Sequence, residues 1–206
     1  MFACVRENEK TLTMDKEPKL VMYQHDDVAR AEVESFIQNI YQARYGARVR
    51  SFTPTLLGLK DPQGQLIAAV GYRYADTDAL FLERYVDTPV EQVLSRHVGV
   101  ALPRSGLVEV AHLVALKPGQ GRRMMRELGA LLQSNGVDWV VSTVTRELRH
   151  LFERMGIASK ALGVADPARL GPDVKDWGSY YEHDPVVLAV QLQNAMRLSP
   201  RLVGGA

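Results

Sequence analysis

The sequence predicts an α/β fold of the α+β kind, with a mixed central β-sheet and helices on both of its faces. Two segments, residues 107–116 and 137–144, are almost wholly apolar, as strands covered on both sides are. The segment between them has apolar residues at every third or fourth position, which indicates an amphipathic helix. A chain of 206 residues is long enough for one domain with a substantial core.

The N-terminal part predicts a tail, a strand and a helix. Residues 1–19 are polar and lack periodicity, so we expect a loose tail there. Residues 20–23 fit a short strand. Asp26 or Asp27 is a suitable N-cap for a helix that ends at Gly46, and its apolar residues lie on one side. We expect this helix to pack on the sheet.

A hairpin and a charged segment follow. Residues 55–60 and 65–74 are strand candidates, and the sequence Asp-Pro-Gln-Gly between them suits a type I turn. This pattern predicts an antiparallel hairpin. Pro89 then opens a helix, because the first helical position needs no N–H. Glu83 and Arg84 precede it and belong either to a solvated surface or to the wall of an acceptor pocket.

The turn after the first apolar segment predicts an anion site. Gly119, Gln120 and Gly121 open a helix, and the first N–H groups of a helix have no internal partner. Arg122 and Arg123 lie in its first turn, where the helix dipole disfavours each cation by roughly 0.3–1 kcal/mol. A bound phosphate would reverse this cost, whereas two solvated arginines would only tolerate it.

Two polar residues interrupt the strand at residues 107–116. A carboxylate in a buried strand is costly unless it is paired, so Glu109 has either a structural partner such as an arginine or a role as general base. His112 is either a satisfied core histidine or a second catalytic candidate. Strict alternation sends the two side chains to opposite faces, unless a β-bulge intervenes.

The last third of the chain has a weaker pattern. The expected elements are a short helix at residues 161–170 broken by Pro167, a loop at 171–176, a last strand at 186–190 and a fraying tail at 197–206. Trp177, Tyr180 and Tyr181 form either a substrate wall or one end of the core. The folded domain therefore covers residues 20–196.

Composition argues against several classes of protein. The formal charge of +1, with both signs mixed, gives no reason to expect nucleic acid. Cys4 is the only cysteine, so neither an intrachain disulfide nor a cysteine metal cluster is possible, and the five histidines are too scattered to predict a metal. The N-terminus lacks the apolar region of a signal peptide, and no stretch approaches ~18 apolar residues. We expect a cytoplasmic protein without a transmembrane segment.

Several segments resemble a known family. LFLERYVDTPVE at residues 80–91, VEVAHLV at 108–114 and WGSYYEHDPVV at 177–187 are similar to the thermostable hemolysin family. The order of strand, glycine turn, helix and strand, followed by LRHLFERMGI, resembles the GNAT acyltransferase fold. The resemblance covers residues 32–190 and implies a single GNAT-like domain.

The resemblance also implies functions for particular residues. The donor would be a fatty acyl thioester of CoA or of the phosphopantetheine arm of acyl carrier protein, and a small amine would be the acceptor, with Glu109 as base or amine positioner. The implied donor-binding residues are Leu113, Val114, Ala115 and Leu116 through their backbone, and Gly119, Gln120, Gly121, Arg122 and Arg123 as phosphate cradle. The implied substrate-binding residues are Glu83, Arg84, Thr143, Thr145, Phe152, Trp177, Tyr180 and Tyr181.

Two positions depart from the GNAT pattern. Leu116 stands where the turn commonly has a basic or amide residue, and Phe152 stands where a tyrosine often protonates the departing thiolate. Tyr180, Tyr181, Thr143, Thr145 or water would then supply the proton, or the thiolate would leave unassisted. These departures resemble the acyl-homoserine lactone synthases, which are more distant GNAT relatives that take acyl groups from carrier protein.

Three functions are compatible with these observations. The first is an N-acyltransferase in which the amine attacks the thioester directly, because no GxSxG nucleophile motif occurs. The second is a non-catalytic module that binds acyl thioesters, which the residues at 116 and 152 favour. The third is a membrane-active, hemolysin-like protein, which needs the basic amphipathic helix at residues 120–133 to expose its apolar side.

Overall fold

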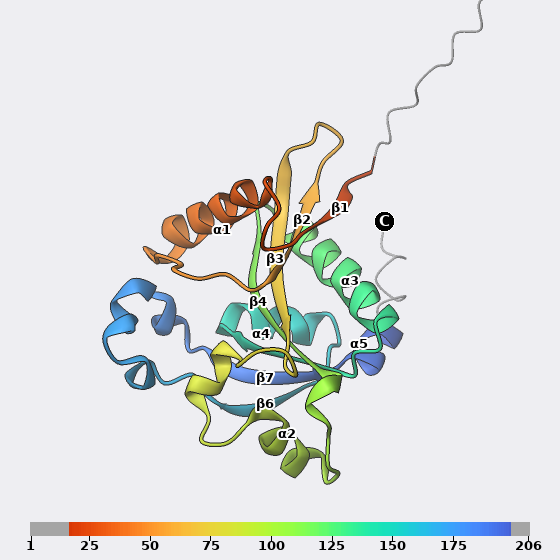
Figure 1. The fold of residues 1–206 in the computed structure, drawn as a ribbon, viewed down its shortest axis with the longest axis vertical. Coiled ribbons are helices and arrows are strands. Elements are labelled where there is room, and N and C mark those ends of the chain that lie inside the picture. The colour runs from red at the N-terminus through yellow and green to blue at the C-terminus, as the bar shows by residue number, and fades with distance from the viewer. Residues whose placement is uncertain (1–16, 199–206) are drawn as a thin grey trace, which may run out of the picture.

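The computed structural model describes residues 17–198 as one seven-stranded sheet surrounded by helices (Figure 1). The strands are β1 (Lys19–Tyr23), β2 (Thr55–Lys60), β3 (Leu66–Tyr74), β4 (Leu107–Ala115), β5 (Trp139–Val144), β6 (Ser159–Val164) and β7 (Val186–Gln191). Their order in the sheet is β1-β2-β3-β4-β5-β7-β6. The pair β4 and β5 is parallel and the other pairs are antiparallel, so the predicted mixed sheet is confirmed.

Helices cover both faces of this sheet, as predicted. The α-helices are α1 (Arg30–Tyr45), α2 (Val90–Val98), α3 (Pro118–Ser134), α4 (Arg146–Arg154) and α5 (Leu192–Leu198). Leu56 and Leu57 are consecutive in β2 and therefore point to opposite faces. Leu56 packs with Ile37 of α1, whereas Leu57 packs with Met124 of α3. All four side chains are fully buried, and each contributes about 1.5–3 kcal/mol relative to an exposed position.

The central feature of the sheet is a gap between β4 and β5. These strands pair only at Leu107↔Trp139, Val108↔Val140 and Glu109↔Val141. Beyond Glu109, β4 stays paired with β3, and beyond Val141, β5 stays paired with β7. The carboxyl ends of the two parallel strands therefore diverge, and this is the place where open α/β sheets commonly bind ligands.

Two predicted segments differ from the structure. The helix expected at residues 161–170 is wrong: Ser159–Val164 forms β6, an edge strand paired with β7, and the 3₁₀ segment η3 (Pro167–Trp177) follows it. The loop expected at residues 171–176 also lies within η3, which is kinked at Gly171 with φ 58°. Pairing with β7 decides the structure of β6, because an exposed edge strand has little hydrophobic alternation of its own.

Three element boundaries near the termini differ from the prediction. Helix α1 begins at Arg30, later than the expected cap, because the Asp27 side chain accepts a hydrogen bond from the Ala29 N–H at 2.8 Å and stabilises a preceding turn. The helix ends at Gly46, as predicted, with φ 65°. Helix α5 takes in Arg197, which was assigned to the C-terminal tail, and Lys19, assigned to the N-terminal tail, begins β1. The remaining tail predictions, residues 1–16 and 199–206, lie outside the described residues.

The packing of α3 bears on the membrane-active alternative. Its apolar residues Met124, Leu128 and Leu132 are buried against the sheet, so the basic amphipathic helix has no free apolar side. Among the helices within residues 17–198, none combines the length and apolar composition needed to cross a bilayer.

Candidate active site

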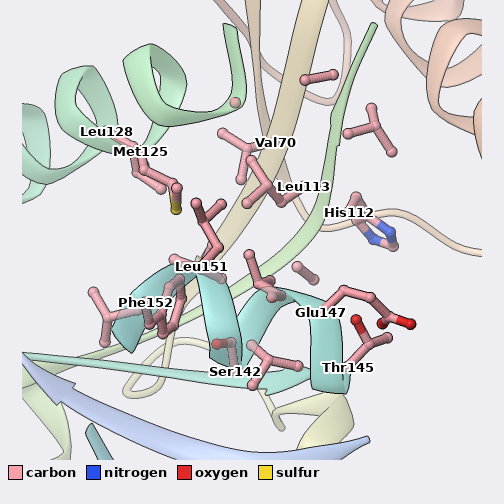
Figure 2. Close-up of a pocket in the computed structure, with 18 of the residues that line it drawn as sticks. Val70, His112, Leu113, Met125, Leu128, Ser142, Thr145, Glu147, Leu151 and Phe152 are labelled. Carbon is pink, nitrogen blue, oxygen red and sulfur yellow. The ribbon is translucent and has the colours of Figure 1, made fainter. Parts of the chain in front are cut away.

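A large cavity of about 530 Å³ fills the gap between β4 and β5. Its walls include residues 110–116 of β4 and the segment that follows, residues 140 and 142–145 of β5 and its end, and the facing sides of α3 and α4. Figure 2 shows Met125 and Leu128 of α3 above Leu151 and Phe152 of α4, with Val70 and Leu113 of the strands β3 and β4 beside them. Most of this wall is hydrophobic, which suits an apolar ligand.

The two ends of the large cavity differ in polarity. In Figure 2, His112, Thr145 and Glu147 lie at one end, away from the apolar group around Met125 and Phe152. Glu147 Oε1 accepts a hydrogen bond from His183 Nδ1 at 2.7 Å, and the Thr145 side chain also contacts Glu147. A ligand with a polar reacting group and an apolar chain would therefore have a defined orientation in this cavity.

A β-bulge places His112 at the polar end. Between β3 and β4 the pairing changes from Gly71↔Ala111 to Ala69↔Val114, so β4 carries one extra residue. His112 has φ 58°, a left-handed conformation that costs a non-glycine residue about 1–3 kcal/mol. Gly71 makes room for this arrangement, because a β-carbon there would lie 2.1 Å from Thr53 Oγ1 and 3.2 Å from His112 Cδ2. The expected bulge is thus present and sets the direction of the imidazole.

The His112 ring lies deep in the molecule but remains accessible through two cavities. Its neighbours are the rings of Phe52, 5.3 Å away between centroids, and Tyr41, 6.5 Å away. Within residues 17–198, no group forms a hydrogen bond with either ring nitrogen. Desolvation, with the positive charges of Arg73 and Arg30, lowers the pKa of His112 to about 3. The imidazole is therefore neutral at pH 7, and its two ring nitrogens have no hydrogen-bond partner among the described residues.

Glu109 has a different environment. Its side chain is 3% exposed, and its two oxygens accept hydrogen bonds from the backbone N–H groups of Phe81 and Leu82, both at 2.9 Å. These groups begin the 3₁₀ helix η1 (Phe81–Tyr85). Arg73 Nε lies 3.2 Å from Oε2, a distance that makes an ion pair, although the N–H is not aligned for a hydrogen bond.

This environment matches the structural explanation for a buried carboxylate in β4. Burial raises the pKa of Glu109, and the N–H groups of Leu82 and Phe81, with Arg73, offset part of that increase. Neither cavity includes Glu109 in its wall. Of the two predicted catalytic residues, His112 therefore lines both cavities, whereas Glu109 lines neither.

The predicted phosphate turn is open at Gly119, but the side chains of Gln120 and Arg123 have other partners. Nothing lies within 4 Å of a β-carbon built on Gly119, so the turn is open to a ligand. The Gln120 side chain accepts a hydrogen bond from the Lys117 N–H at 2.9 Å and thereby caps α3. Arg123 points elsewhere, with Nη2 3.0 Å from Glu17 Oε2.

The basic residues that line the large cavity were missed by sequence reasoning. They are Lys117 just before α3, Arg126 in the middle of α3, Arg44 of α1 and Arg154 at the end of α4. Gly121 lines the cavity, whereas Gly119, Gln120, Arg122 and Arg123 do not. Helical spacing from the predicted turn would not have indicated Arg126, because Arg122, four residues earlier on the same side of α3, does not line the cavity.

The predicted hydroxyl and aromatic residues divide between the cavities. Phe152, Thr143, Thr145 and Tyr180 line the large cavity, and Trp177 lines a smaller one. Thr143 Oγ1 is buried and has no hydrogen-bond partner within the described chain. Tyr181 belongs to neither wall, and its hydroxyl lies 2.5 Å from that of Tyr85.

His112 also lines a second, small cavity of about 170 Å³. The loop after α1, η1 and η3 supply most of its wall, and Arg84 is among its residues. Glu83 is not, because its oxygens pair with Arg104 and accept the N–H groups of Leu80 and Val90. Burial alone would raise the pKa of Glu83, but Arg104 and these N–H groups lower it. Glu83 is therefore a structural residue at the base of α2.

No cluster of three histidine, cysteine, aspartate or glutamate side chains suited to a metal occurs within residues 17–198.

The sequence profile of the family described as thermostable hemolysin matches residues 23–196. No curated protein sequence matches the chain.

Several solved structures share the fold at low sequence identity. The AHL synthase LasI has a TM-score of 0.60 at 13% identity, over 88% of this chain and 95% of its own. BjaI with MTA, a CoA-dependent acyl-homoserine lactone synthase, has a TM-score of 0.61 at 10% identity, over 92% of this chain and 91% of its own. FeeM, an N-acyl amino acid synthase from uncultured soil microbes, has a TM-score of 0.58 at 12% identity, over 86% of this chain and 93% of its own. These likenesses establish the GNAT-like fold that the sequence indicated.

Proposed function

The chain belongs to the thermostable hemolysin family, and we propose that it is an N-acyltransferase that moves a fatty acyl group from a pantetheine thioester to a small amine. One observation carries this proposal. The gap between β4 and β5 holds a large, mostly apolar cavity that meets a second, smaller cavity at the neutral imidazole of His112. Two substrates, one in each cavity, can therefore reach the same residue.

The backbone of β4 suits the amide groups of a pantetheine arm. Beyond Glu109, the side of β4 that faces β5 has no strand partner, so its N–H and C=O groups there are available to a ligand. Residues 113–116 form this part of the wall. The open turn at Gly119 and the cations Lys117 and Arg126 would hold the phosphate at the far end of the arm.

The donor is either acyl-CoA or acyl carrier protein, and one of the similar structures, BjaI, is a CoA-dependent synthase. The apolar wall around Met125, Leu128 and Phe152 favours a fatty acyl chain over a small acetyl group. The cavity volume of about 530 Å³ lies within the ~300–1,000 Å³ range of sites for extended small molecules.

The proposed reaction is a direct attack of the amine on the thioester. The amine nitrogen forms a bond with the carbonyl carbon, the C–S bond breaks, and His112 takes the proton that the amine loses. That proton then reaches the departing thiolate through water. Ser142 also lines the cavity, but no hydrogen bond joins its hydroxyl to His112, so the geometry gives no activated serine nucleophile.

Thr143 offers assistance to the leaving group. Its buried hydroxyl oxygen has no partner among the described residues, and Thr143 lines the large cavity together with Phe152, which has no proton to give. We propose that this hydroxyl donates a hydrogen bond to the thiolate. Because a pantetheine thiol resembles cysteine, with a pKa near ~8.5, its thiolate needs only modest stabilisation.

The experiment that tests the function measures thiol release from acyl-CoA and acyl carrier protein with a panel of amines, for the wild type and His112→Gln. Loss of a positioned general base should lower the rate about 10²–10⁴-fold without weakening thioester binding. His97→Gln is the matched control, because His97 is exposed on α2 and lines neither cavity. Thioester binding without transfer by the wild type would instead identify a non-catalytic binding module, which Phe152 favours.

A further inference from the structure

The small cavity has an unusual charge balance. Four arginines line it, namely Arg48, Arg50, Arg73 and Arg84, against the two aspartates Asp173 and Asp176. The wall therefore carries an excess of two positive charges, because His112 is neutral. Glu109, just behind Arg73, offsets only one of them. A ligand with a negative charge would complete this site.

The two aspartates are already occupied. Both oxygens of Asp176 accept hydrogen bonds from Arg50, at 2.6 and 2.7 Å. Asp173 accepts Nη2 of Arg84 at 3.0 Å. Neither carboxylate is therefore available to bind the amino group of a substrate. The groups of the wall that can bind a ligand are the two other arginines.

Arg48 is the arginine with a free guanidinium. Within residues 17–198, no hydrogen bond or ion pair involves its side chain. Its positive charge acts on the Asp176 carboxylate only through a longer-range electrostatic interaction. Arg73 is held on one side by Glu109 and the carbonyl of Ala79, yet its buried Nε makes no aligned hydrogen bond. Two guanidinium groups therefore have N–H donors to spare at this cavity.

The backbone that carries Arg48 is fixed. Its N–H donates to the carbonyl of Asp176 at 2.6 Å, which ties the loop after α1 to η3. Gly178 continues this contact, because a β-carbon there would lie only 2.0 Å from the carbonyl oxygen of Tyr45. Several crossing contacts thus organise the wall before a ligand arrives, as a specific binding site requires.

We propose that the small cavity binds the carboxylate of the acceptor, and that the acceptor is an amino acid, with its carboxylate on Arg48 and Arg73 and its amino group at His112. This proposal rests on the acyltransferase function proposed above. The guanidinium fork matches a planar carboxylate, whereas an uncharged amine leaves the positive excess uncompensated. Phe81 and Trp177 give the same cavity an apolar wall for the side chain of the amino acid.

The reaction then yields an N-acyl amino acid and a free thiol. The amino nitrogen forms a bond with the acyl carbon as the C–S bond breaks, and the proton lost by the nitrogen passes through His112 to the thiolate. The carboxylate takes no part in bond making. Its negative charge also lies close to His112, so bound acceptor favours the protonated imidazole during the transfer.

The test compares acceptors that differ only in the anionic group. Wild-type protein with one acyl thioester receives glycine or L-leucine, then the corresponding amides and aminophosphonates, and N-acyl product is measured. We expect kcat/KM for the amino acids to exceed that for the amides about 10- to 100-fold, the loss expected for charge-assisted hydrogen bonds. Arg48→Ala should raise KM for the amino acids by about tenfold or more, and leave KM for the thioester unchanged.

Arg96→Ala is the matched control, because Arg96 is exposed on α2 and lines neither cavity. Equal rates with amino acids and amides, or an Arg48→Ala variant indistinguishable from the control, would overturn the carboxylate site while acyl transfer itself stands. Faster transfer to aminophosphonates would also overturn it, in favour of a phosphate-type acceptor. No product with any amine would instead refute the proposed function.

Discussion

Glu109→Gln is the substitution that separates structure from catalysis at this site. Each carboxylate oxygen accepts one backbone N–H at 2.9 Å, from Phe81 and Leu82. Glutamine has one acceptor oxygen, so it can satisfy one of these N–H groups and must present its own NH₂ to the other. The second N–H then stays buried without a partner, which costs about 1–3 kcal/mol.

The lost charge adds to this cost. Arg73 Nε lies 3.2 Å from Oε2, and a neutral amide leaves that partly buried guanidinium without its counter-charge. We therefore expect Glu109→Gln to lower the free energy of unfolding by roughly 2–4 kcal/mol. Because η1 is displaced rather than the reacting atoms, transfer by the folded protein should fall much less than in His112→Gln.

The assay is urea unfolding, in which the midpoint shifts while the slope with denaturant stays the same, together with thiol release by protein kept far below that midpoint. Glu153→Gln is the control, because this exposed carboxylate on α4 has no described ion pair, and its effect should stay within about 0.5 kcal/mol. Unchanged stability with transfer reduced as strongly as in His112→Gln would refute this reasoning and make Glu109 the base.

Three other predictions concern His112 and its surroundings. The pKa of His112 is near 3 in the folded protein and ~6.5 when unfolded, so unfolded chains bind the extra proton and stability should fall as pH drops below about 6.5, by up to ~1.4 kcal/mol per pH unit. His112→Gln should reduce that slope in unfolding curves measured from pH 7 to 4, and an unaltered slope would contradict the assignment. Gly71→Ala should cost about 1–3 kcal/mol, because its β-carbon overlaps Thr53 Oγ1 at 2.1 Å; a melting temperature equal to wild type would show that the bulge is not so constrained. Thr143→Val should slow thiol release by about tenfold or more while binding of the thioester is retained, and an equal rate would exclude its hydrogen bond to the thiolate.

The central part of the fold was predictable from sequence because its signals are local. The strands at β4 and β5 are nearly continuous apolar runs, and α3 has both a three-to-four periodicity and terminal signals, with Asn135 and Gly136 at its end. Edge strand β6 was missed, because its pairing with β7 is a tertiary contact that leaves half-exposed residues with little pattern. The 3₁₀ segment η3 was missed for a related reason, since Gly171 interrupts it.

The site itself was predictable only in part. Sequence reasoning singled out His112 and Trp177, which line cavities in the structure, and the open turn at Gly119, which lines neither cavity. It did not find Arg48, which looks like an ordinary loop arginine until η3 folds back over the loop after α1. It also left the role of Glu109 open, because the N–H groups that occupy its oxygens come from residues 27 and 28 positions away in the chain.

The central claim is that the gap between β4 and β5 binds an acyl thioester. Thermal unfolding with CoA, acyl-CoAs and acyl carrier proteins of increasing chain length tests it most directly. A thioester at ~100 times its dissociation constant should add about 2.7 kcal/mol to stability, which raises the midpoint of a chain this size by roughly 5–11 °C. We predict a shift that grows with acyl chain length, because added methylenes enter the apolar part of the cavity. An unchanged midpoint with every thioester would contradict the account.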